Sequence, residues 1–332
     1  MLKIRDLEVN QTVTIPCVVK SATARETKAK KPYLSLEFYD GVDTIMGNYW
    51  DWTSGNIPAV NTILDVTAQV TEWQGTKQLN VKKLVVNLEK HISEFAPESG
   101  YNIAEVFKQA YECTLNVRDD ALRNLTLSIL DTLQERWLSV PGAVGVHHAY
   151  VGGTLVHSLS VARIACAISK LIPGASDDLC FVGGLLHDIG KLFTYELDGV
   201  KIRMTDEGQL FDHVFMGANF ISNYAEDCPG VDVSMPDTYF KISMLTHIIL
   251  SHHGKLEYGA AVPPLSMEAL IVSHADGVDA STQQIIEQSK KLGNAVWTDR
   301  IYALSNKPHI TTQFMERLFA TETNHSGVAT PQ

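Results

Sequence analysis

The sequence predicts an α+β protein of two domains, in which a small five-stranded β-barrel precedes an all-α helical bundle. Residues 1–88 contain short, β-branched segments in which apolar and polar side chains alternate, the pattern of half-buried strands. From about residue 101 the apolar residues follow the helical spacing instead. The 332 residues are enough for each domain to bury a core of its own.

Five short strands in fewer than 90 residues favour a closed barrel, because closure leaves no unpaired sheet edge. These strands are Thr12–Val19, Pro32–Asp40, Thr44–Trp52, Ile63–Trp73 and Gln78–Val86. In the second strand, alternation puts Leu34, Leu36 and Phe38 on the inner face. The residues expected to face outward are Tyr33, Ser35, Glu37, Tyr39, Trp50 and Trp52.

The second part of the chain is predicted to be helical, with proline and glycine residues between the helices. The helices are Ile103–Asn116, Arg118–Trp137, Gly152–Ile172, Asp177–Asp188, Gln209–Ala225, Thr238–His253 and Ser266–Ser289. We therefore divide the chain into a barrel at 1–88, a helical linker at 89–120, a helical domain at 121–320 and a tail at 321–332. The tail is poor in apolar residues and is expected to be disordered.

Composition indicates a soluble globular protein, with 45% hydrophobic and 20% charged residues. No apolar run approaches the roughly 20 residues that a membrane span needs, and the first ten residues lack the apolar stretch of a signal peptide. The five cysteines are scattered and form no CxxC pair, which argues for reduced thiols. We therefore expect a cytoplasmic protein without a membrane partner.

The net charge of −11 is distributed unevenly along the chain. Residues 1–90 carry eleven Lys and Arg against ten Asp and Glu, whereas the remainder carries 16 against 28. The first part holds a local basic run at Arg25, Lys28, Lys30 and Lys31. An acidic chain therefore does not exclude an anionic polymer as ligand of the barrel, and the carboxylates of the second part could bind a cation.

The most informative segment is LLHDIGK, residues 185–191. An apolar helix there reaches His187 and Asp188 and, on this interpretation, ends at Gly190, because glycine often terminates helices. Burying a carboxylate in such surroundings is costly unless a cation compensates it. An ion pair between Asp188 and Lys191 would explain the charges but not the neighbouring imidazole. The segment therefore favours a functional site that binds a metal.

The order of His157, His187-Asp188 and Asp276 resembles the H…HD…D signature of the HD superfamily. Members of that superfamily bind one or two divalent metals between helices and hydrolyse phosphate esters. The segments HHAYVGG, IILSHHG and DGVDA, which begin at residues 147, 248 and 276, extend the likeness. With the preceding barrel, they are similar to YhaM-type 3′→5′ exoribonucleases, which join an OB-fold to an HD domain. The likeness covers about residues 1–310.

The resemblance implies one or two metal ions per chain. The ligands of the first would be His157, His187, Asp188 and Asp276. A second ion would share Asp188 and could use His213, His247 and His252. Imidazoles and carboxylates suit Mn²⁺, Fe²⁺, Co²⁺ or Mg²⁺, and Mn²⁺ is the ion we favour. The residues expected to act in catalysis are Asp188, Lys191 and His213. For His253 and His274, a hydrogen bond at a helix end is an equal alternative to a role in the site.

The resemblance also implies that the barrel binds single-stranded nucleic acid, with RNA favoured. Outward aromatic side chains beside lysines provide base stacking, worth about 1–3 kcal/mol per base, together with attraction of phosphates. The expected contacts are Lys28, Lys30, Lys31, Tyr33 and Trp50. Packing of the aromatics within the protein, with solvated lysines, is an equal alternative for any one of them.

The leading hypothesis is a metal-dependent 3′→5′ exonuclease that hydrolyses single-stranded RNA, or also DNA, to nucleoside 5′-monophosphates. Two alternatives stay open. One is an HD phosphohydrolase of small nucleotides whose barrel serves oligomerisation or regulation, and the other is a nucleic-acid-binding protein with an inactive HD site. A homo-oligomer is compatible with all three. The complete H…HD…D set argues against an inactive site, and the barrel with its basic loop argues against a small substrate.

Overall fold

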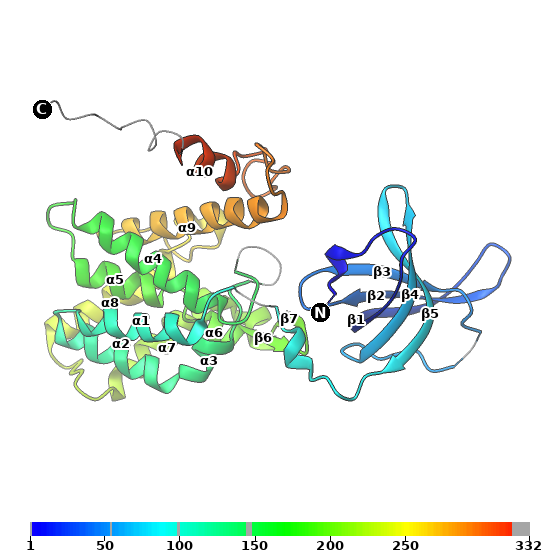
Figure 1. Ribbon diagram of the computed structural model, residues 1–332. Helices are drawn as coiled ribbons and strands as arrows, with labels where there is room; N and C mark the ends of the chain where they lie inside the picture. Colours follow the sequence, from blue (N-terminus) through cyan, green and yellow to red (C-terminus); the bar gives the residue numbers. More distant parts are fainter. Residues whose placement is uncertain (1, 54, 98–99, 144–147, 321–332) are drawn as a thin grey trace, which may run out of the picture. The chain divides into compact units, whose positions relative to one another are not determined.

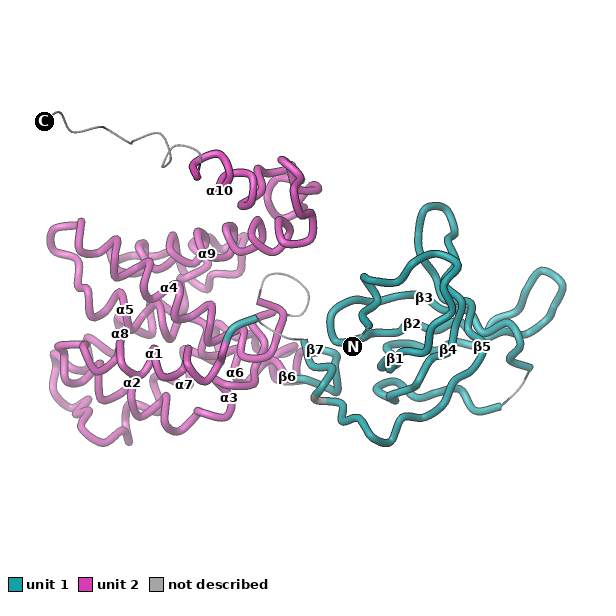
Figure 2. Tube along the Cα trace, viewed as in Figure 1, with its two compact units in different colours: residues 1–101, 196–203 teal, residues 102–195, 204–332 magenta. Residues whose placement is uncertain are grey.

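A computed structural model describes residues 2–53, 55–97, 100–143 and 148–320 (Figure 1). His147 and the predicted tail at 321–332 lie outside these residues. The chain divides into two compact units, coloured separately in Figure 2. Unit 1 contains Met1–Tyr101 and Glu196–Arg203, and unit 2 contains Asn102–Tyr195 and Met204–Gln332.

The N-terminal strands close into a five-stranded barrel of the OB type, which confirms the predicted fold class. The strands are β1 (Thr12–Glu26), β2 (Pro32–Tyr39), β3 (Thr44–Tyr49), β4 (Ile63–Trp73) and β5 (Thr76–Val86). Their order around the barrel is β1-β2-β3-β5-β4, and the pairing of β4 with β1 closes it. Neighbouring strands are antiparallel, except that β3 and β5 are parallel.

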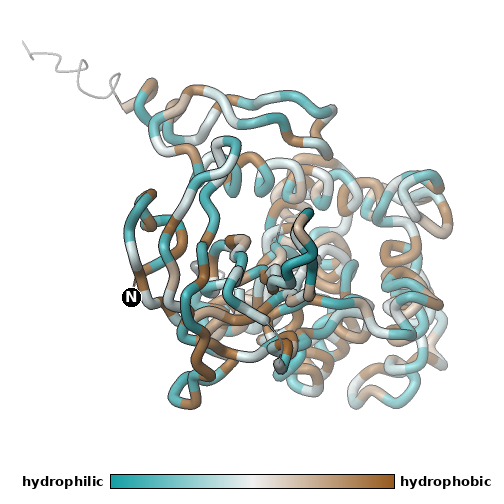
Figure 3. Tube along the Cα trace, turned by 90° about the vertical axis from the view of Figure 1, so that its right-hand side faces the viewer, coloured by the Kyte–Doolittle hydropathy of each residue, from teal (hydrophilic) through white to brown (hydrophobic). Residues whose placement is uncertain are grey.

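The interior of the barrel is built as the alternation predicts. Leu34, Leu36 and Phe38 are at most 1% exposed and belong to one apolar cluster with residues of the other strands. Gly47 of β3 approaches the same interior so closely that a Cβ there would lie 2.6 Å from Phe38 Cε2. Only glycine fits beside that ring. Figure 3 shows hydrophilic and hydrophobic residues intermixed along these strands.

Ser35 and Tyr39 are corrections to the predicted outer face, because both residues are buried rather than exposed. Tyr39 shows the reason more clearly. It belongs to a second cluster, which comprises Val18, Tyr39, Ile63, Phe95 and Val200. Val200 comes from a hairpin formed by β6 (Tyr195–Asp198) and β7 (Lys201–Met204), far along the chain. Burial of apolar surface between this hairpin and the barrel wall explains why residues 196–203 belong to unit 1.

Unit 2 consists mainly of helices. Their bounds are α1 (Ile103–Leu115), α2 (Asp120–Thr132), α3 (Gln134–Ser139), α4 (Gly153–Ser169), α5 (Asp177–Leu186), α6 (Lys191–Thr194), α7 (Asp206–Asp227), α8 (Pro236–Ser251), α9 (Met267–Lys291) and α10 (Thr312–Ala320). Several begin at a side chain that accepts a hydrogen bond from the amide three residues on, which compensates a free N–H of the first turn. These caps are Asn102, Asp119, Ser176, Thr205 and Ser266.

The centre of unit 2 is the packing of α5 against α4 and α9. Every residue from Leu179 to Leu186 of α5 is buried. Gly184 allows α5 to cross α4 closely, since a Cβ at that position would lie 2.7 Å from the Ala162 Cα. This crossing brings the C-terminal end of α5 next to the N-terminal half of α4, where the candidate site lies.

Several elements differ from their predicted extents. The helix predicted at 118–137 divides at Leu133 into α2 and α3, and α1 lies within the predicted linker while burying Phe107 and Ala110 in the helical core. The β6–β7 hairpin, α6 and α10 were not predicted. Among the described residues, no helix combines the length and the apolar character needed to cross a membrane.

Candidate metal centre

Five elements of unit 2 each bring part of the histidine–aspartate set to one place. The set comprises His157 on α4, His187 and Asp188 after α5, His213 on α7, His252 and His253 after α8, and Asp276 on α9. These side chains are buried, with Asp276 and His253 partly so. Residues spread over more than a hundred positions therefore converge because the helices that carry them share one core.

The four residues predicted to hold the first metal lie within contact distance of one another. His157 Nε2 is 3.1 Å from Asp276 Oδ1 and 3.4 Å from Asp188 Oδ2. His187 Nε2 is 3.2 Å from His157 Nε2 and 3.3 Å from Asp188 Oδ2. Two imidazole nitrogens and two carboxylate oxygens thus face a common centre.

The second oxygen of Asp188 faces a different pair of histidines. Asp188 Oδ1 lies 3.4 Å from His213 Nε2 and 3.6 Å from His252 Nε2. Ring nitrogens of His213, His252 and His253 also lie within 4.8 Å of one another. Asp188 therefore stands between two groups of donors. His253, for which the sequence left a helix-end hydrogen bond as an equal alternative, is beside the second group.

Hydrogen bonds on the far side of four rings determine which nitrogen faces the centre. The Nδ1 atoms of His187 and His252 lie 2.8 Å and 2.7 Å from the carbonyl oxygens of Gly184 and Ile249. His157 Nδ1 and His213 Nδ1 each lie 2.7 Å from a carboxylate oxygen, of Asp279 and Asp212 respectively. In the neutral ring, which is the form that binds a metal, such a partner holds the proton on Nδ1 and leaves the Nε2 lone pair toward the centre.

A second layer of polar side chains supports His157, and sequence reasoning did not assign it. One Asp279 oxygen lies 2.7 Å from His157 Nδ1 and 3.0 Å from His148 Nε2, and its other oxygen accepts a hydrogen bond from Ser160. His148 Nδ1 is 2.8 Å from the Tyr150 hydroxyl. The signal was the spacing, because Asp279 follows Asp276 by three residues and so lies on the same face of α9.

The electrostatics of the centre call for positive charge. Burial alone would lower the pKa of His157, but hydrogen bonds with Asp188, Asp276 and Asp279 outweigh it and raise the pKa well above its usual range. Burial would likewise raise the pKa of Asp188, but Lys191 and His187 keep it well below the usual range. Lys191 Nζ lies 2.6 Å from Asp188 Oδ2. The carboxylates of Asp188, Asp276 and Asp279 thus lie around His157, and Lys191 is the permanent cation beside Asp188.

The second group of donors is suited to a cation because it contains a neutral imidazole and buried polar atoms without hydrogen-bond partners among the described residues. Burial lowers the pKa of His252 well below its usual range, so this ring stays neutral, the form that binds a metal. Asp188 Oδ1, His213 Nε2 and His252 Nε2 are buried and have no hydrogen-bond partner among the described residues. Buried polar atoms are normally paired, and an ion bound among these three atoms would satisfy them.

The spacing of the donors also fits a divalent ion. Donor atoms about 2.1 Å from one ion lie roughly 3 to 3.5 Å apart. The separations of 3.1 to 3.6 Å around Asp188 agree with this. A mixed set of imidazole nitrogens and carboxylate oxygens is compatible with Mn²⁺, Fe²⁺ or Co²⁺. The residues present therefore fit the metal that the sequence predicts.

The structure does not bring all the predicted residues to this centre. His247 Nε2 accepts a hydrogen bond from the Leu265 amide at 2.9 Å, and His247 is not in the donor groups around Asp188. His274 is exposed on α9. In the barrel, Lys28, Lys30 and Lys31 are exposed in the turn between β1 and β2. Tyr33 stacks on Trp50 with ring centroids 4.4 Å apart.

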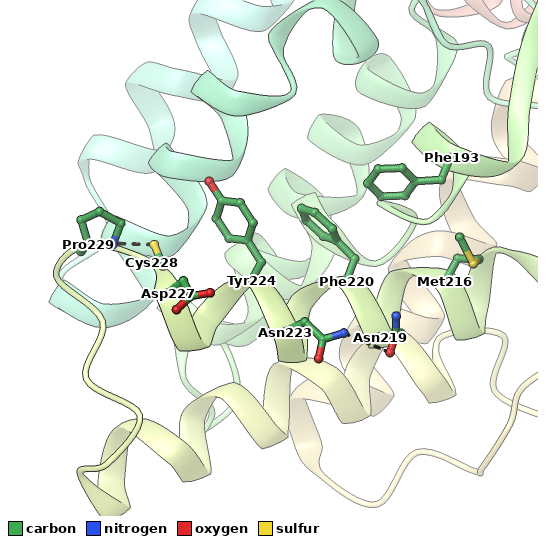
Figure 4. A pocket seen from close by; sticks show the side chains of 9 residues that line it. All are labelled: Phe193, Met216, Asn219, Phe220, Asn223, Tyr224, Asp227, Cys228 and Pro229. Atoms are coloured by element: carbon green, nitrogen blue, oxygen red, sulfur yellow. Dashed lines mark hydrogen bonds between the residues drawn. The ribbon is translucent and has the colours of Figure 1, made fainter.

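A separate pocket of about 550 Å³ lies along α7 (Figure 4). Phe193, Phe220 and Tyr224 form a row of rings in it, with neighbouring centroids 5.0 Å and 5.1 Å apart. Asn223 donates a hydrogen bond to Asn219 on its other side. None of the candidate metal ligands lines this pocket. This pocket is therefore distinct from the buried histidine–aspartate centre.

Comparison with known proteins gives the class of the helical part. Residues 154–281 match the model of the HD domain family, so the chain carries an HD domain after its barrel. A crystal structure of the L. monocytogenes phosphodiesterase PgpH HD domain is 21% identical, covering 48% of this chain and 73% of that one, with a TM-score of 0.29. The HD match and the donor cluster support the prediction of a metal-dependent hydrolase.

Two structures from Methanococcus maripaludis are also similar to part of the chain. A crystal structure of a domain of replication protein A is 26% identical, covering 26% of this chain and 92% of that one, with a TM-score of 0.23. A solution structure of the second OB-fold domain of replication protein A is 22% identical, covering 27% and 96%, also with a TM-score of 0.23.

Proposed function

We propose that this chain is a metal-dependent 3′→5′ exonuclease that hydrolyses single-stranded RNA, with DNA as an alternative substrate. The observation that supports this best is the position of Asp188. One of its oxygens faces His157 and His187, and the other faces His213 and His252. A carboxylate shared between two groups of donors suits phosphodiester hydrolysis with two ions.

In the proposed site the protein supplies ligands, charge and orientation. A bound divalent ion would stabilise negative charge on the phosphoryl oxygens and make water a better nucleophile near neutral pH. Lys191 keeps Asp188 ionised and adds a positive charge to the centre. The first ion would be held by His157, His187, Asp188 and Asp276, and the second by Asp188, His213 and His252.

The barrel supports a polymeric substrate rather than a mononucleotide. Tyr33 and Trp50 form an aromatic surface in which Trp50 is 40% exposed. Aromatic faces of this kind stack on any base, and exposed lysines attract the phosphates between them. Lys28, Lys30 and Lys31 lie in the turn just before Tyr33. The direction of degradation, from the 3′ end, rests on the resemblance to the YhaM-type enzymes.

A 5′-labelled single strand incubated with the protein and Mn²⁺ is expected to give a ladder of progressively shorter labelled products. Degradation should slow at a stem, because stacking within a duplex hides the base faces from the aromatic surface. The products separated on a denaturing gel, and the released nucleoside 5′-monophosphates identified by chromatography, would check this. A chelator should stop the reaction and added Mn²⁺ should restore it.

Other product patterns would identify a different enzyme with the same centre. Immediate release of a labelled mononucleotide would mean attack from the 5′ end, and one internal cut would mean an endonuclease. Hydrolysis of nucleoside triphosphates but not of the strand would favour the small-nucleotide hydrolase. Each of these results would contradict the exonuclease proposal.

Replacing Lys28, Lys30 and Lys31 together with Ala is expected to reduce the salt dependence of single-strand binding. Each phosphate contact contributes roughly 0.7 to the slope of log K against log salt, so the slope should fall by up to about 2. Fluorescence anisotropy with a labelled oligonucleotide at several salt concentrations measures it. Catalysis of a small chromogenic phosphodiester should stay unchanged, since these lysines are in the barrel.

The matched control removes the same charge from exposed positions of the helical unit. The variant replaces Lys170, Lys290 and Lys291 with Ala. Its salt slope should equal that of the wild type if the barrel lysines make the contacts. Equal slopes in all three proteins would show that the lysines of the β1–β2 turn are merely solvated.

A further inference from the structure

The backbone of Asp212 adopts a conformation that residues other than glycine rarely adopt. Its φ of 62° and ψ of 157° interrupt α7, so that the helix changes direction between Phe211 and His213. This region of backbone space is occupied almost solely by glycine, because a Cβ is crowded there. Such conformations persist only when the surrounding structure enforces them, and they concentrate at functional sites.

The side chain of Asp212 makes two contacts that this conformation allows. Its Oδ1 lies 2.7 Å from His213 Nδ1 and accepts the Val214 N–H at 3.0 Å. The second contact caps the part of α7 that follows the interruption. The first contact acts on a ring whose other nitrogen is buried beside Asp188. Asp212 itself is largely exposed, with 63% of its side chain accessible.

The consequences for His213 follow from the two ring nitrogens. In the neutral ring, a carboxylate at Nδ1 holds the proton on that nitrogen, which leaves Nε2 as an acceptor. His213 Nε2 is buried, has no hydrogen-bond partner among the described residues, and points at Asp188 Oδ1 from 3.4 Å. The carboxylate also fixes the rotation of the ring. The other candidate ligands of α5 and α8 obtain the same effect from backbone carbonyls of their own helices.

We propose that Asp212 is a positioning residue, which holds His213 in the tautomer and orientation that a metal ion at the second donor group requires. The interruption of α7 brings the Asp212 carboxylate next to the His213 ring. Within a continuous helix, a residue directly before a histidine faces away from it. The strained backbone thus allows the Asp212 carboxylate to contact His213 Nδ1. The inference rests on the metal centre of the proposed function and is independent of the RNA substrate.

A purely structural role, capping the second part of α7, is the competing explanation. Three substitutions separate the two roles. Asp212→Gly relieves the backbone and removes both contacts, whereas Asp212→Ala removes the contacts but keeps the crowded Cβ. Asp212→Asn keeps an oxygen acceptor in a residue that tolerates positive φ better than alanine does.

Positioning predicts different rankings for stability and for metal binding. The melting temperature of the metal-free glycine variant should be at least as high as that of the wild type, and that of the alanine variant lower by a few degrees. Affinity for the second equivalent of Mn²⁺, measured by titration and elemental analysis, should fall about tenfold or more in both. The asparagine variant should bind the second ion with intermediate affinity.

A measurement on the metal-free protein tests the tautomer itself. Two-dimensional ¹H–¹⁵N spectra of histidine-labelled protein should show His213 with a protonated Nδ1 in the wild type and a mixture of tautomers in the glycine variant. His187 should keep its spectrum in all variants and is the internal control. If the glycine variant keeps both the His213 tautomer and the affinity for the second Mn²⁺, Asp212 is a helix cap only. That outcome would overturn the inference even if the RNA assay succeeds.

Discussion

Asp188→Asn is expected to reduce phosphodiester hydrolysis by at least about 10³-fold and to lower the amount of bound metal. The two oxygens of Asp188 each face a different group of donors. Metal ions contribute several kcal/mol of transition-state stabilisation, and a loss of about 4 kcal/mol corresponds to roughly 10³-fold in rate. Turnover of a chromogenic phosphodiester under Mn²⁺ and elemental analysis of the purified protein measure the two effects.

The Asp188 variant needs controls for folding, because the carboxylate also pairs with the largely buried Lys191. Removing one partner of a buried ion pair can itself destabilise a protein by several kcal/mol. Asp131→Asn changes an exposed carboxylate on α2 and should leave activity and metal content unchanged. Circular dichroism of each variant shows whether it is folded. A folded Asp188→Asn protein with wild-type turnover would rule out the proposed site.

The fold class could be predicted because the sequence shows both the two-residue alternation of strands and the 3.6-residue spacing of helices. Leu34, Leu36 and Phe38 alternate, and all three are buried. What alternation cannot reveal is which outward residues are covered by distant segments. Tyr39 is buried by residues that include Val200. The sequence around Tyr39 and the sequence around Val200 contain no pattern that predicts this contact. Likewise β1 continues to Glu26 through exposed residues, where pairing with β2 rather than burial defines the strand.

The candidate centre could be predicted where chemistry and spacing coincide. The His187-Asp188 pair stands out because an apolar helix ends in two polar groups, and the structure places it among the other candidate ligands. The supporting residues are less visible. Asp279 and His148 resemble ordinary polar residues until the fold joins positions 131 residues apart. Asp212 gave no signal, since its importance comes from a backbone conformation that sequence patterns do not record.

Gly190 has a different role from the one that its place in the sequence predicts. The sequence favoured it as a helix-terminating glycine, yet its φ of −59° and ψ of −27° are ordinary helical values. Its real role is close approach between two backbones. A Cβ at this position would lie 1.9 Å from His213 O and 2.8 Å from Gly217 N, which are main-chain atoms of α7. The turn that carries Asp188 therefore packs directly on the helix that carries His213.

Gly190→Ala is accordingly expected to be among the most harmful small substitutions in the chain. Backbone atoms cannot rotate away as a side chain can, so the turn and α7 must move apart. Overpacking of this kind costs about 1–3 kcal/mol and occasionally more, and the displacement separates His213 from Asp188. We expect a melting temperature lower by at least about 3 °C, together with weaker binding of the second Mn²⁺.

Gly277→Ala is the matched control, because it makes the same chemical change next to another candidate ligand, Asp276. Gly277 lies inside α9, and a Cβ there would have no atom within 4 Å. Alanine in a helix interior is favoured over glycine by about 0.5–1 kcal/mol, so this variant should melt slightly higher than the wild type and keep its activity. Thermal denaturation of the two variants thus gives shifts of opposite sign. A Gly190→Ala protein that is as stable and as active as Gly277→Ala would mean that α7 and the Asp188 turn are not in backbone contact.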